Sequence, residues 1–499
     1  MALCRAPDRG ALTIETPVSY GDRVAQLAAA DPVSAVLRVV AIDGTETVVT
    51  WPELHRRSTQ IARAFVARGG GPGTRIAVGL RNSPEFVMCV LAAWKLGMIP
   101  VPVRWDLPDW ERERVLEVID GPIAIGAADL PWLRASADDA DDAPLPAAIS
   151  PQTNGICSSG STGAVKVILM DKPAVFDDMV GMPFAASWGP VARPQVVLVM
   201  APMYHTNGFA TLFSLLAGDH LVVLEKFDAA RIVDLIERHR VTTFTATTTM
   251  LQRIADLPGI DERDLSSVVW ILQGAAVIAP TLVRRWIDLL GAEKFFQSYG
   301  MTEGIGLCAI RGDEWLQHPG SVGRGFRGTE LRILDEDGNE LPAGETGEIY
   351  MKSPSSGMFQ YLGGAPLPPR TVEGFSTGGD LGWLEPDGFL HIVDRRVDMI
   401  ITGGANVFPA EVETALIDHP GIADVVVIGL RDDEWGRRVH AVVEPADPAS
   451  PPTVDDVRAY AKARLAAYKV PKTVEFVDVI PRSEATKVSR AALVDARGG

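Results

Sequence analysis

The sequence predicts an α/β chain with a large multi-subdomain N-terminal α/β domain, residues 1–394, and a small C-terminal α+β domain, residues 395–499. The first observation behind this prediction is the alternation of short β-branched runs with segments whose apolar residues recur at helical spacing, a pattern typical of largely parallel sheets. The second is the length of 499 residues, which exceeds what one hydrophobic core usually serves. The third is a change of pattern near residue 394, after which about 100 residues remain, enough for a separate small domain.

The elements of the larger domain are predicted from these patterns in chain order. A solvated surface excursion is expected first, at the acidic and alanine-rich residues 135–143. Buried strands rich in Val, Ile, Leu and Thr are expected at residues 196–200, 221–224, 241–247 and 268–272. Helices with one apolar face are expected between these strands, at residues 229–240 and 280–290.

The pattern changes to extended runs from residue 330. Asp337-Gly338 is a turn signal between two such runs and predicts a hairpin over residues 331–341. In the C-terminal unit, helices are predicted at residues 409–417 and 454–465, and strands at 425–428, 440–443 and 474–477.

Composition excludes several classes of protein. The chain has 64 Asp+Glu against 47 Lys+Arg, a formal net charge of −17, whereas nucleic-acid binders usually carry a basic domain or stripe. The four cysteines lie far apart without metal-ligand spacing, which favours a reducing compartment. The N-terminus has no apolar signal-peptide core, and the most apolar stretch is broken by polar residues and glycines. We therefore expect a cytoplasmic protein without a membrane span that binds no nucleic acid.

A serine- and glycine-rich segment, residues 158–166, is the first candidate site. Glycines let backbone N–H groups turn toward an anion, and hydroxyls and a lysine add donors and positive charge, as a polyphosphate requires. A Walker loop is excluded, because Ser161 follows Gly160 where that motif requires lysine. A plain surface loop would fit the segment taken alone. Its candidate nucleotide contacts are Ser159, Gly160, Ser161, Thr162, Gly163 and Lys166.

A second candidate site is the segment 299–303. Here Glu303 offers a hard oxygen ligand for Mg²⁺, Thr302 a hydroxyl for a phosphate, and Tyr299 a flat face for a base. A lone glutamate after threonine is more often a solvated charge or the N-terminal charge of a helix.

Two further segments lie nearer the C-terminus. Asp380 could accept both hydroxyls of a ribose, with the positive charge of Arg395 alongside. Lys487 is a candidate catalytic lysine in a polar tail, although taken alone it would fit an ordinary surface lysine.

In their order and spacing, these segments resemble the adenylate-forming superfamily of acyl- and aryl-CoA ligases, carrier-loading adenylation domains and luciferases. The resemblance covers nearly the whole chain, from the Thr50-Trp51 segment to Lys487, and includes residues 201–209 and 320–324. It is closest to the acyl- or aryl-CoA ligases.

The resemblance implies a role for each candidate residue. It places Lys487 in adenylate formation and Thr302 at the α-phosphate, with Glu303 as the metal ligand. His205 would lie at the acyl carboxylate or gate its pocket. His205 alone would fit a satisfied core residue equally well. The remaining implied contacts to nucleotide or thiol are Gly274, Ala275, Ala276, Tyr299, Gly300, Asp380, Arg395, Gly403 and Gly404.

The resemblance also implies an activity. In this family a carboxylate attacks the α-phosphate of ATP to give an acyl-adenylate and pyrophosphate, and a thiol then displaces AMP. An acid–CoA ligase that uses ATP, Mg²⁺ and coenzyme A on a small-molecule carboxylic acid is therefore expected. The C-terminal domain is expected to be mobile, presenting Lys487 for the first step and Gly403-Gly404 for the second. Phe209, Met250 and Ile305 suggest a pocket for a hydrophobic or aromatic acid.

Several positions depart from the family pattern. Val165 and Val167 flank Lys166 where Pro and Gly are usual, and Thr486 replaces the usual Gly before Lys487. At the domain boundary, Asp394 and the hinge position Val397 depart from the pattern. Before Asp380, two glycines, Gly378 and Gly379, are present where the family usually has one.

These departures leave two alternatives open. One is an adenylating enzyme that does not use CoA, loading a carrier protein or activating nitrite as an ATP-dependent diazotase. The other is a regulatory protein that binds ATP or AMP without turnover, against which the presence of both Lys166 and Lys487 argues.

Overall fold

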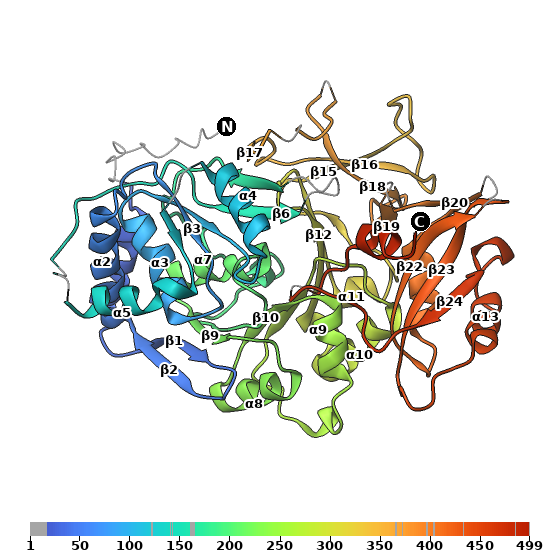
Figure 1. The fold of residues 1–499 in the computed structure, drawn as a ribbon, viewed down its shortest axis with the longest axis horizontal. Helices are drawn as coiled ribbons and strands as arrows, with labels where there is room; N and C mark the ends of the chain where they lie inside the picture. Colours follow the sequence, from blue (N-terminus) through green and yellow to red (C-terminus); the bar gives the residue numbers. More distant parts are fainter. Residues whose placement is uncertain are drawn as a thin grey trace, which may run out of the picture.

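The computed structural model describes the chain in eleven stretches, separated by short gaps. Its helices and strands form a large N-terminal part, coloured from blue to yellow in Figure 1, and a smaller C-terminal domain, coloured red. The two lie side by side. Within the described part of the chain, no helix is long and apolar enough to cross a membrane. The described residues are 17–120, 123–139, 141, 143–159, 165–364, 367–371, 373–395, 398–402, 405–432, 434–484 and 486–498.

A nine-stranded sheet is the centre of the N-terminal part. Strands β12, β11, β10, β8, β9 and β1 are neighbours in that order and run parallel, so their carboxyl ends share one edge. The four predicted strands are β8 to β11, and their prediction is confirmed. The sheet order is β14 (Arg324–Gly325), β13 (Leu307–Arg311), β12 (Phe295–Gly300), β11 (Trp270–Gln273), β10 (Thr243–Ala246), β8 (Val196–Val199), β9 (His220–Leu224), β1 (Ala35–Val40) and β2 (Glu46–Thr50).

Helices with one apolar face bury that face against the main sheet. Helix α8 (Ala229–His239) begins at Asp228, whose carboxylate accepts a hydrogen bond from the backbone N–H of Arg231, and it confirms the predicted helix. Helix α10 confirms the other, and its Trp286 packs in the same core as Phe295. The helices of this part are α1 (Tyr20–Ala30), α2 (Trp51–Ala67), α3 (Pro84–Lys95), α4 (Asp109–Ile119), α5 (Leu130–Asp139), α6 (Thr206–Phe209), α7 (Thr211–Leu216), α8, α9 (Thr248–Ala255), α10 (Pro280–Leu290) and α11 (Gly312–Trp315).

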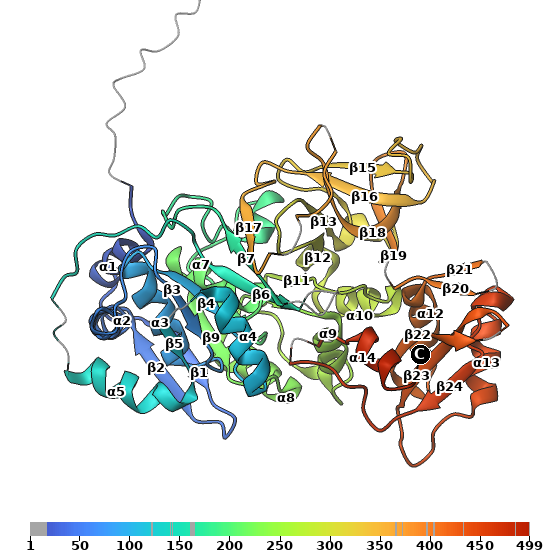
Figure 2. The ribbon, with the colours of Figure 1, turned by 45° about the horizontal axis from the view of Figure 1, so that its top comes forward.

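Three smaller sheets complete the N-terminal part. A parallel sheet lies over helix α3 and has the order β4 (Ile99–Pro102), β3 (Arg75–Val78), β5 (Ile123–Ile125). An antiparallel sheet carries Lys166 and has the order β17 (Phe359–Leu362), β7 (Val165–Met170), β6 (Gly155–Ser159). The third, which leads into the C-terminal domain in Figure 2, has the order β15 (Glu330–Leu334), β16 (Gly347–Lys352), β18 (Ser376–Leu384), β19 (Leu390–Arg395).

The C-terminal domain has its own five-stranded sheet and its own apolar core, which includes Val412, Val427 and Val457. The predicted fold class, a large N-terminal α/β domain with a small C-terminal α+β domain, is confirmed. The position of the boundary at residues 394 and 395 stays a prediction. The elements are β20 (Ile400–Thr402), β21 (Ala405–Val407), α12 (Pro409–Ile417), β22 (Ile422–Asp432), β23 (Gly436–Pro445), α13 (Val454–Lys462), β24 (Thr473–Phe476) and α14 (Arg490–Asp495).

Two local predictions can be compared with the structure in detail. In the acidic stretch 135–143, α5 continues to Asp139, with Ala135 and Asp138 exposed to solvent and Ala137 buried. The predicted hairpin forms around the Asp337-Gly338 turn: Glu340 bridges to Leu334, and the backbone N–H groups of Asp335 and Leu341 donate to the carbonyls of Asn339 and Ile333 at 2.9 and 2.8 Å. Strand β15 also pairs over five positions with β16.

Lys95 is a buried lysine at the end of α3, with 6% of its surface exposed. Its ammonium group donates to the His55 carbonyl and to the Thr59 hydroxyl, both at 2.7 Å, and these partners carry no negative charge. Burial therefore lowers the pKa of Lys95 to about 7.

The depressed pKa of Lys95 predicts a pH-dependent stability. Between pH 7 and 10 the unfolded chain holds a proton that the folded chain has lost, so the free energy of unfolding should rise with pH, by at most about 1.4 kcal/mol per unit. Below pH 7 both states are protonated and the effect is constant. Denaturant melts of the wild type and Lys95→Met from pH 6 to 9 should diverge above pH 7. Parallel curves would show that Lys95 is charged in the folded protein.

Candidate active site

The predicted site segments gather at one edge of the main sheet. His205 follows β8, Thr247 follows β10, the loop 274–276 follows β11, and Thr302 and Glu303 follow β12. Because these strands are parallel neighbours, the segments meet where their carboxyl ends converge, the usual place for ligands in open α/β sheets.

Lys166, Glu303 and Tyr361 form one cluster at this edge. The Lys166 ammonium lies 3.1 Å from Glu303 Oε1, and the Tyr361 hydroxyl donates to the same oxygen at 2.7 Å. The ammonium also lies 4.4 Å from the centre of the Tyr361 ring. Burial opposes the ionisation of Glu303, but the hydrogen bonds from Tyr361 and Lys166 outweigh it and lower the pKa of Glu303. The carboxylate is therefore ionised at neutral pH.

The donor set at Glu303 fits a hard cation. Both contacts described above are to Oε1, so Oε2 is the oxygen through which the carboxylate could bind Mg²⁺. Magnesium usually takes one or two protein carboxylates together with phosphate oxygens and water, and an ionised glutamate beside a lysine matches that preference. The lysine would then be free to contact a phosphate.

Tyr299 and Asp380 are brought together from different sheets. The Tyr299 hydroxyl, at the end of β12, donates to Asp380 Oδ2 on β18 at 2.7 Å. The aspartate is 6% exposed. A Cβ at Gly378 would meet only the flexible end of Met301, at 2.5 Å from its Cε, which can move aside. Gly379 has a φ of +81°, which favours glycine, so this glycine shapes the backbone of β18 just before Asp380.

The loop 274–276 is held in a specific shape by a buried glutamine. The side-chain amide of Gln273 donates to the Ala276 carbonyl at 2.7 Å and to the Thr248 hydroxyl at 3.1 Å. Ala275 has a φ of +75°, uncommon for a residue with a Cβ, so this backbone is strained and held by its neighbours. The arrangement exposes Ala275 and Ala276 at the edge of the sheet where the other site segments converge.

His205 lies at the start of α6 and is largely buried. Burial, followed by the positive charges of Lys487 and Arg104, lowers the pKa of His205 to about 4. At neutral pH the imidazole is therefore uncharged and can act as a hydrogen-bonding group. The next residue, Thr206, is linked to Thr302, with 3.2 Å between the two hydroxyl oxygens.

The depressed pKa of His205 predicts an uncharged ring throughout the working range. In NMR titrations of histidine-labelled protein, the signal missing from His205→Gln should titrate near pH 4, and removing the positive charge in Lys487→Ala should raise that midpoint. His205 should therefore contribute no inflection near pH 6.5 to the pH dependence of the adenylation rate. Any inflection seen there should persist in His205→Gln. A midpoint at or above 6.5 would contradict the burial and the charge environment described here.

Lys487 belongs to the C-terminal domain but lies at the same edge of the N-terminal sheet. Its charge acts on His205, and the preceding residue, Thr486, has its hydroxyl oxygen 2.8 Å from that of Thr247. Glu484, in the same loop, accepts a hydrogen bond from the Trp105 indole N–H at 3.0 Å. The structure therefore shows the arrangement in which the lysine loop faces the candidate site.

Part of the predicted site lies outside the described residues. This holds for Gly160, Ser161, Thr162, Gly163, Gly403, Gly404 and the hinge position Val397. Ser159 and Arg395 are described as the last residues of β6 and β19, without their side chains. In the backbone register, Arg395 is the partner of Asp380 across β18 and β19.

The residues named for the apolar wall of the acid pocket lie in the hydrophobic cores. Phe209, Met250 and Ile305 are almost fully buried, and each packs in a different core. Core packing accounts for their apolar character, and the acid pocket predicted from them stays a prediction.

Sequence reasoning missed several residues of the site. Tyr361 lies on β17, far along the chain from Glu303, and becomes its neighbour only through the pairing of β17 with β7. Trp105 and Gln273 were also missed, because no motif in the sequence marks them. The signal that could have found Gln273 is its amide at the end of a buried, otherwise apolar strand.

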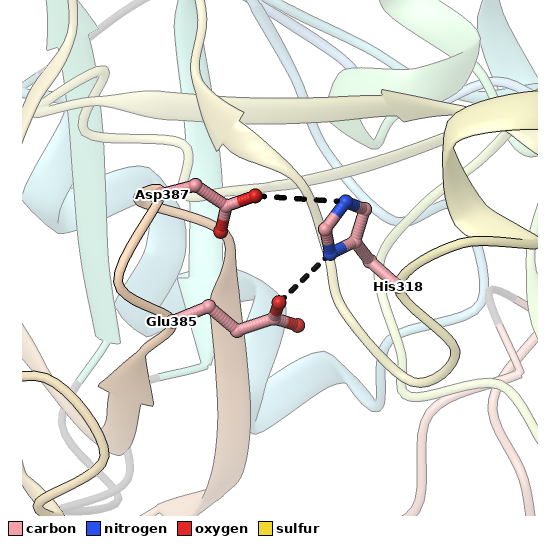
Figure 3. A group of neighbouring side chains, drawn as sticks. All are labelled: His318, Glu385 and Asp387. Carbon is pink, nitrogen blue, oxygen red and sulfur yellow. Dashed lines mark hydrogen bonds and ion pairs between the residues drawn. The ribbon is translucent and has the colours of Figure 1, made fainter.

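A second cluster of titratable groups joins the β18–β19 turn to the segment after α11 (Figure 3). His318 Nδ1 lies 2.8 Å from Glu385 Oε2, and its Nε2 lies 3.7 Å from Asp387 Oδ2. His391 Nε2 lies 2.6 Å from the other oxygen of Glu385. Burial opposes ionisation, but these hydrogen bonds lower the pKa of Glu385. Three of these side chains are close enough to hold a metal, but the contacts they make already support a packing role.

Comparison with known proteins places the chain in a family. Residues 30–154 and 153–362 match the model of the AMP-binding enzymes, and residues 411–487 match the model of the C-terminal domain of those enzymes. The chain belongs to the AMP-binding enzyme family and is a ligase of the adenylate-forming class, as the sequence motifs indicated.

Its relatives include several acid-activating ligases. The feruloyl-CoA synthase of an Amycolatopsis species is 34% identical over 89% of this chain and 92% of its own length. A fatty acid–[acyl-carrier-protein] ligase of Streptomyces coeruleorubidus, ScoC, is 31% identical over 90% of this chain and 91% of its own. The o-succinylbenzoate CoA synthetase of Bacillus subtilis, solved with its acyl-adenylate intermediate, has a TM-score of 0.79 and 27% identity, covering 96% of this chain and 98% of its own.

Proposed function

We propose that this protein is an AMP-forming acid–CoA ligase. It would convert a carboxylic acid, ATP and coenzyme A to an acyl-CoA, AMP and pyrophosphate through an acyl-adenylate. The observation that carries the proposal is the convergence of Lys166, Glu303, Asp380, His205 and the Lys487 loop at one edge of a parallel sheet. Feruloyl-CoA synthase among the relatives supports a hydrophobic or aromatic acid as substrate.

Charge neutralisation is the main demand of the first half-reaction. ATP and the attacking carboxylate are both anions and repel each other unless cations lie between them. In this proposal Lys166 and Lys487 supply two positive charges at the reacting groups, and Glu303 with Thr302 would hold Mg²⁺ and the α-phosphate. The metal would supply further charge stabilisation when bound. The B. subtilis synthetase has also been solved with ATP and a magnesium ion, at 26% identity.

The remaining groups would bind and orient the nucleotide and acid. Asp380, held by the Tyr299 hydroxyl, would accept the ribose hydroxyls, and the ring of Tyr299 with the loop 274–276 would contact the adenine. His205, uncharged and buried, would orient the acid carboxylate without competing with it for a proton. Gly403 and Gly404 would line the path of the thiol after the C-terminal domain has turned.

A panel of carboxylic acids tests this function. Acid-dependent ATP–pyrophosphate exchange should appear with aromatic or fatty acids, and acyl-CoA should form when coenzyme A is added. Exchange without any CoA product would favour a carrier protein as acceptor, for which the ScoC relative is the observation. Exchange with nitrite in place of an acid would favour a diazotase. ATP binding without any exchange would indicate a protein that binds the nucleotide without turnover.

A further inference from the structure

We propose that Glu484 and Thr486 are positioning residues that dock the Lys487 loop on the N-terminal domain and thereby set the balance between the two half-reactions. The inference rests on the proposed function, because it concerns the same site. Neither residue contacts the reacting atoms in this account. They act by holding the catalytic lysine where it faces His205.

The loop that carries Lys487 is built into the C-terminal domain. The Arg482 guanidinium makes a bidentate ion pair with Asp424 on β22, at 2.6 and 2.7 Å, and also donates to the Thr486 carbonyl at 3.0 Å. The backbone N–H of Ser483 donates to the Lys487 carbonyl at 2.9 Å. The described residues Arg482, Ser483, Thr486 and Lys487 are thus tied to one another and to β22, so that they move with the C-terminal domain. Contacts that hold them on the N-terminal part therefore hold the domain as well.

Glu484 sits in a set of donors supplied by the N-terminal domain. Its Oε2 accepts from the Trp105 indole N–H at 3.0 Å and from the Tyr204 hydroxyl at 3.5 Å. Its Oε1 lies 4.0 Å from a nitrogen of Arg81, whose guanidinium stacks 3.6 Å from the centre of the Trp105 ring. Tyr204 immediately precedes His205. The Glu484 carboxylate, three residues before Lys487, is therefore bound by these N-terminal side chains next to the candidate acid site.

Thr486 makes the second contact between the domains. Its hydroxyl lies 2.8 Å from that of Thr247, which is the residue that caps α9. Thr486 has a φ of +61°, a conformation that glycine adopts more easily and that strains a β-branched residue. The family pattern has glycine at this position. The hydroxyl contact to Thr247 explains why this chain has a threonine at position 486 despite the strain, because glycine could not make that contact.

These contacts favour one arrangement of the domains over the other. They exist when the Lys487 loop faces the N-terminal sheet, and they must break when the domain turns to present residues 403–404 to the thiol. Contacts made in only one of two states shift the population toward that state by their own free energy. Glu484 and Thr486 should therefore support adenylation and slow the thioester step.

The test compares matched variants in the two half-reactions. Adenylation is measured as acid-dependent ATP–pyrophosphate exchange, and the thioester step as acyl-CoA formation from supplied acyl-adenylate. Thr486→Ala, which keeps a Cβ at the strained position but removes the hydroxyl, should slow adenylation relative to the thioester step, changing the ratio of the two rates by about fivefold for one hydrogen bond. Thr486→Ser should restore wild-type behaviour. Glu484→Ala should act in the same direction as Thr486→Ala.

Thr453→Ala is the control for a lost hydrogen bond that does not join the domains. It removes a bond within the C-terminal domain, from the Thr453 hydroxyl to Asp456 at 2.6 Å. It should leave the ratio of the two rates unchanged. The proposal is overturned if Thr486→Ala and Glu484→Ala lower both rates equally, leave both unchanged, or match Thr453→Ala. A wild type without exchange for any acid would instead refute the proposed function, so the two failures are distinguishable.

Discussion

Replacing Lys487 with alanine is expected to slow acyl-adenylate formation by about 10²- to 10³-fold, the loss typical of removing one preorganised charge at a reacting centre. The physical reason is that attack on the α-phosphate brings two anions together. Of the two lysines assigned to this step, Lys487 is the one whose charge already acts on His205 beside the proposed acid site. Acyl-CoA formation from supplied acyl-adenylate should remain largely intact, because in the proposed mechanism the thiol step would use the other face of the domain.

The measurement pairs ATP–pyrophosphate exchange with single-turnover formation of acyl-CoA. Lys462→Ala is a suitable control, because Lys462 is an exposed lysine in the last turn of α13 in the same domain. The control should keep both activities. Equal loss of both half-reactions in Lys487→Ala would contradict the assignment of the lysine to adenylation alone.

Replacing Glu303 with glutamine should have the second largest effect. The substitution keeps an oxygen that can accept from Tyr361 but removes the charge that pairs with Lys166 at 3.1 Å and could bind a cation. Adenylation should fall by about 100-fold at a fixed magnesium concentration, with part of the loss recovered as magnesium is raised. Exchange rates across a magnesium titration measure both effects.

The matched control is Glu262→Gln, an exposed glutamate in a short 3₁₀ turn. It should leave both the rate and its magnesium dependence unchanged. If Glu303→Gln retained the wild-type magnesium dependence, Glu303 would not be the metal ligand, and its role would be limited to holding Lys166.

The sequence predicted the large features of the fold because they follow from local patterns. The strands β8 to β11 and the helices α8 and α10 appear where β-branched runs and amphipathic spacing indicated them. The hairpin after Glu330 forms at its turn signal, but that signal does not specify the other partner strand of β15. Strand β15 also pairs with β16, and no local sequence pattern predicts that pairing.

The candidate site shows the same division. Residues that belong to short sequence motifs, such as Lys166 and Glu303, could be predicted as site residues from the sequence. The structure brings these two into contact. Tyr361 could not, because it joins the cluster only through the pairing of β17 with β7. The contact between Thr486 and Thr247 also depends on how the two domains meet, which no residue pattern records.

The net charge of −17 is consistent with this site. An acidic protein can bind a polyphosphate only where cations are concentrated, and Lys166 and Lys487 lie at the one edge where the strands converge. Long-range attraction would contribute little to nucleotide binding, so local contacts must supply the affinity.

Oxygen-isotope transfer tests the central claim most directly. If the acid carboxylate attacks the α-phosphate of ATP, an acid labelled with ¹⁸O in its carboxylate should leave one labelled oxygen in the AMP released on thioester formation, detected by mass spectrometry. Unlabelled AMP, or ADP with the label in inorganic phosphate, would show that no acyl-adenylate forms and would contradict the account.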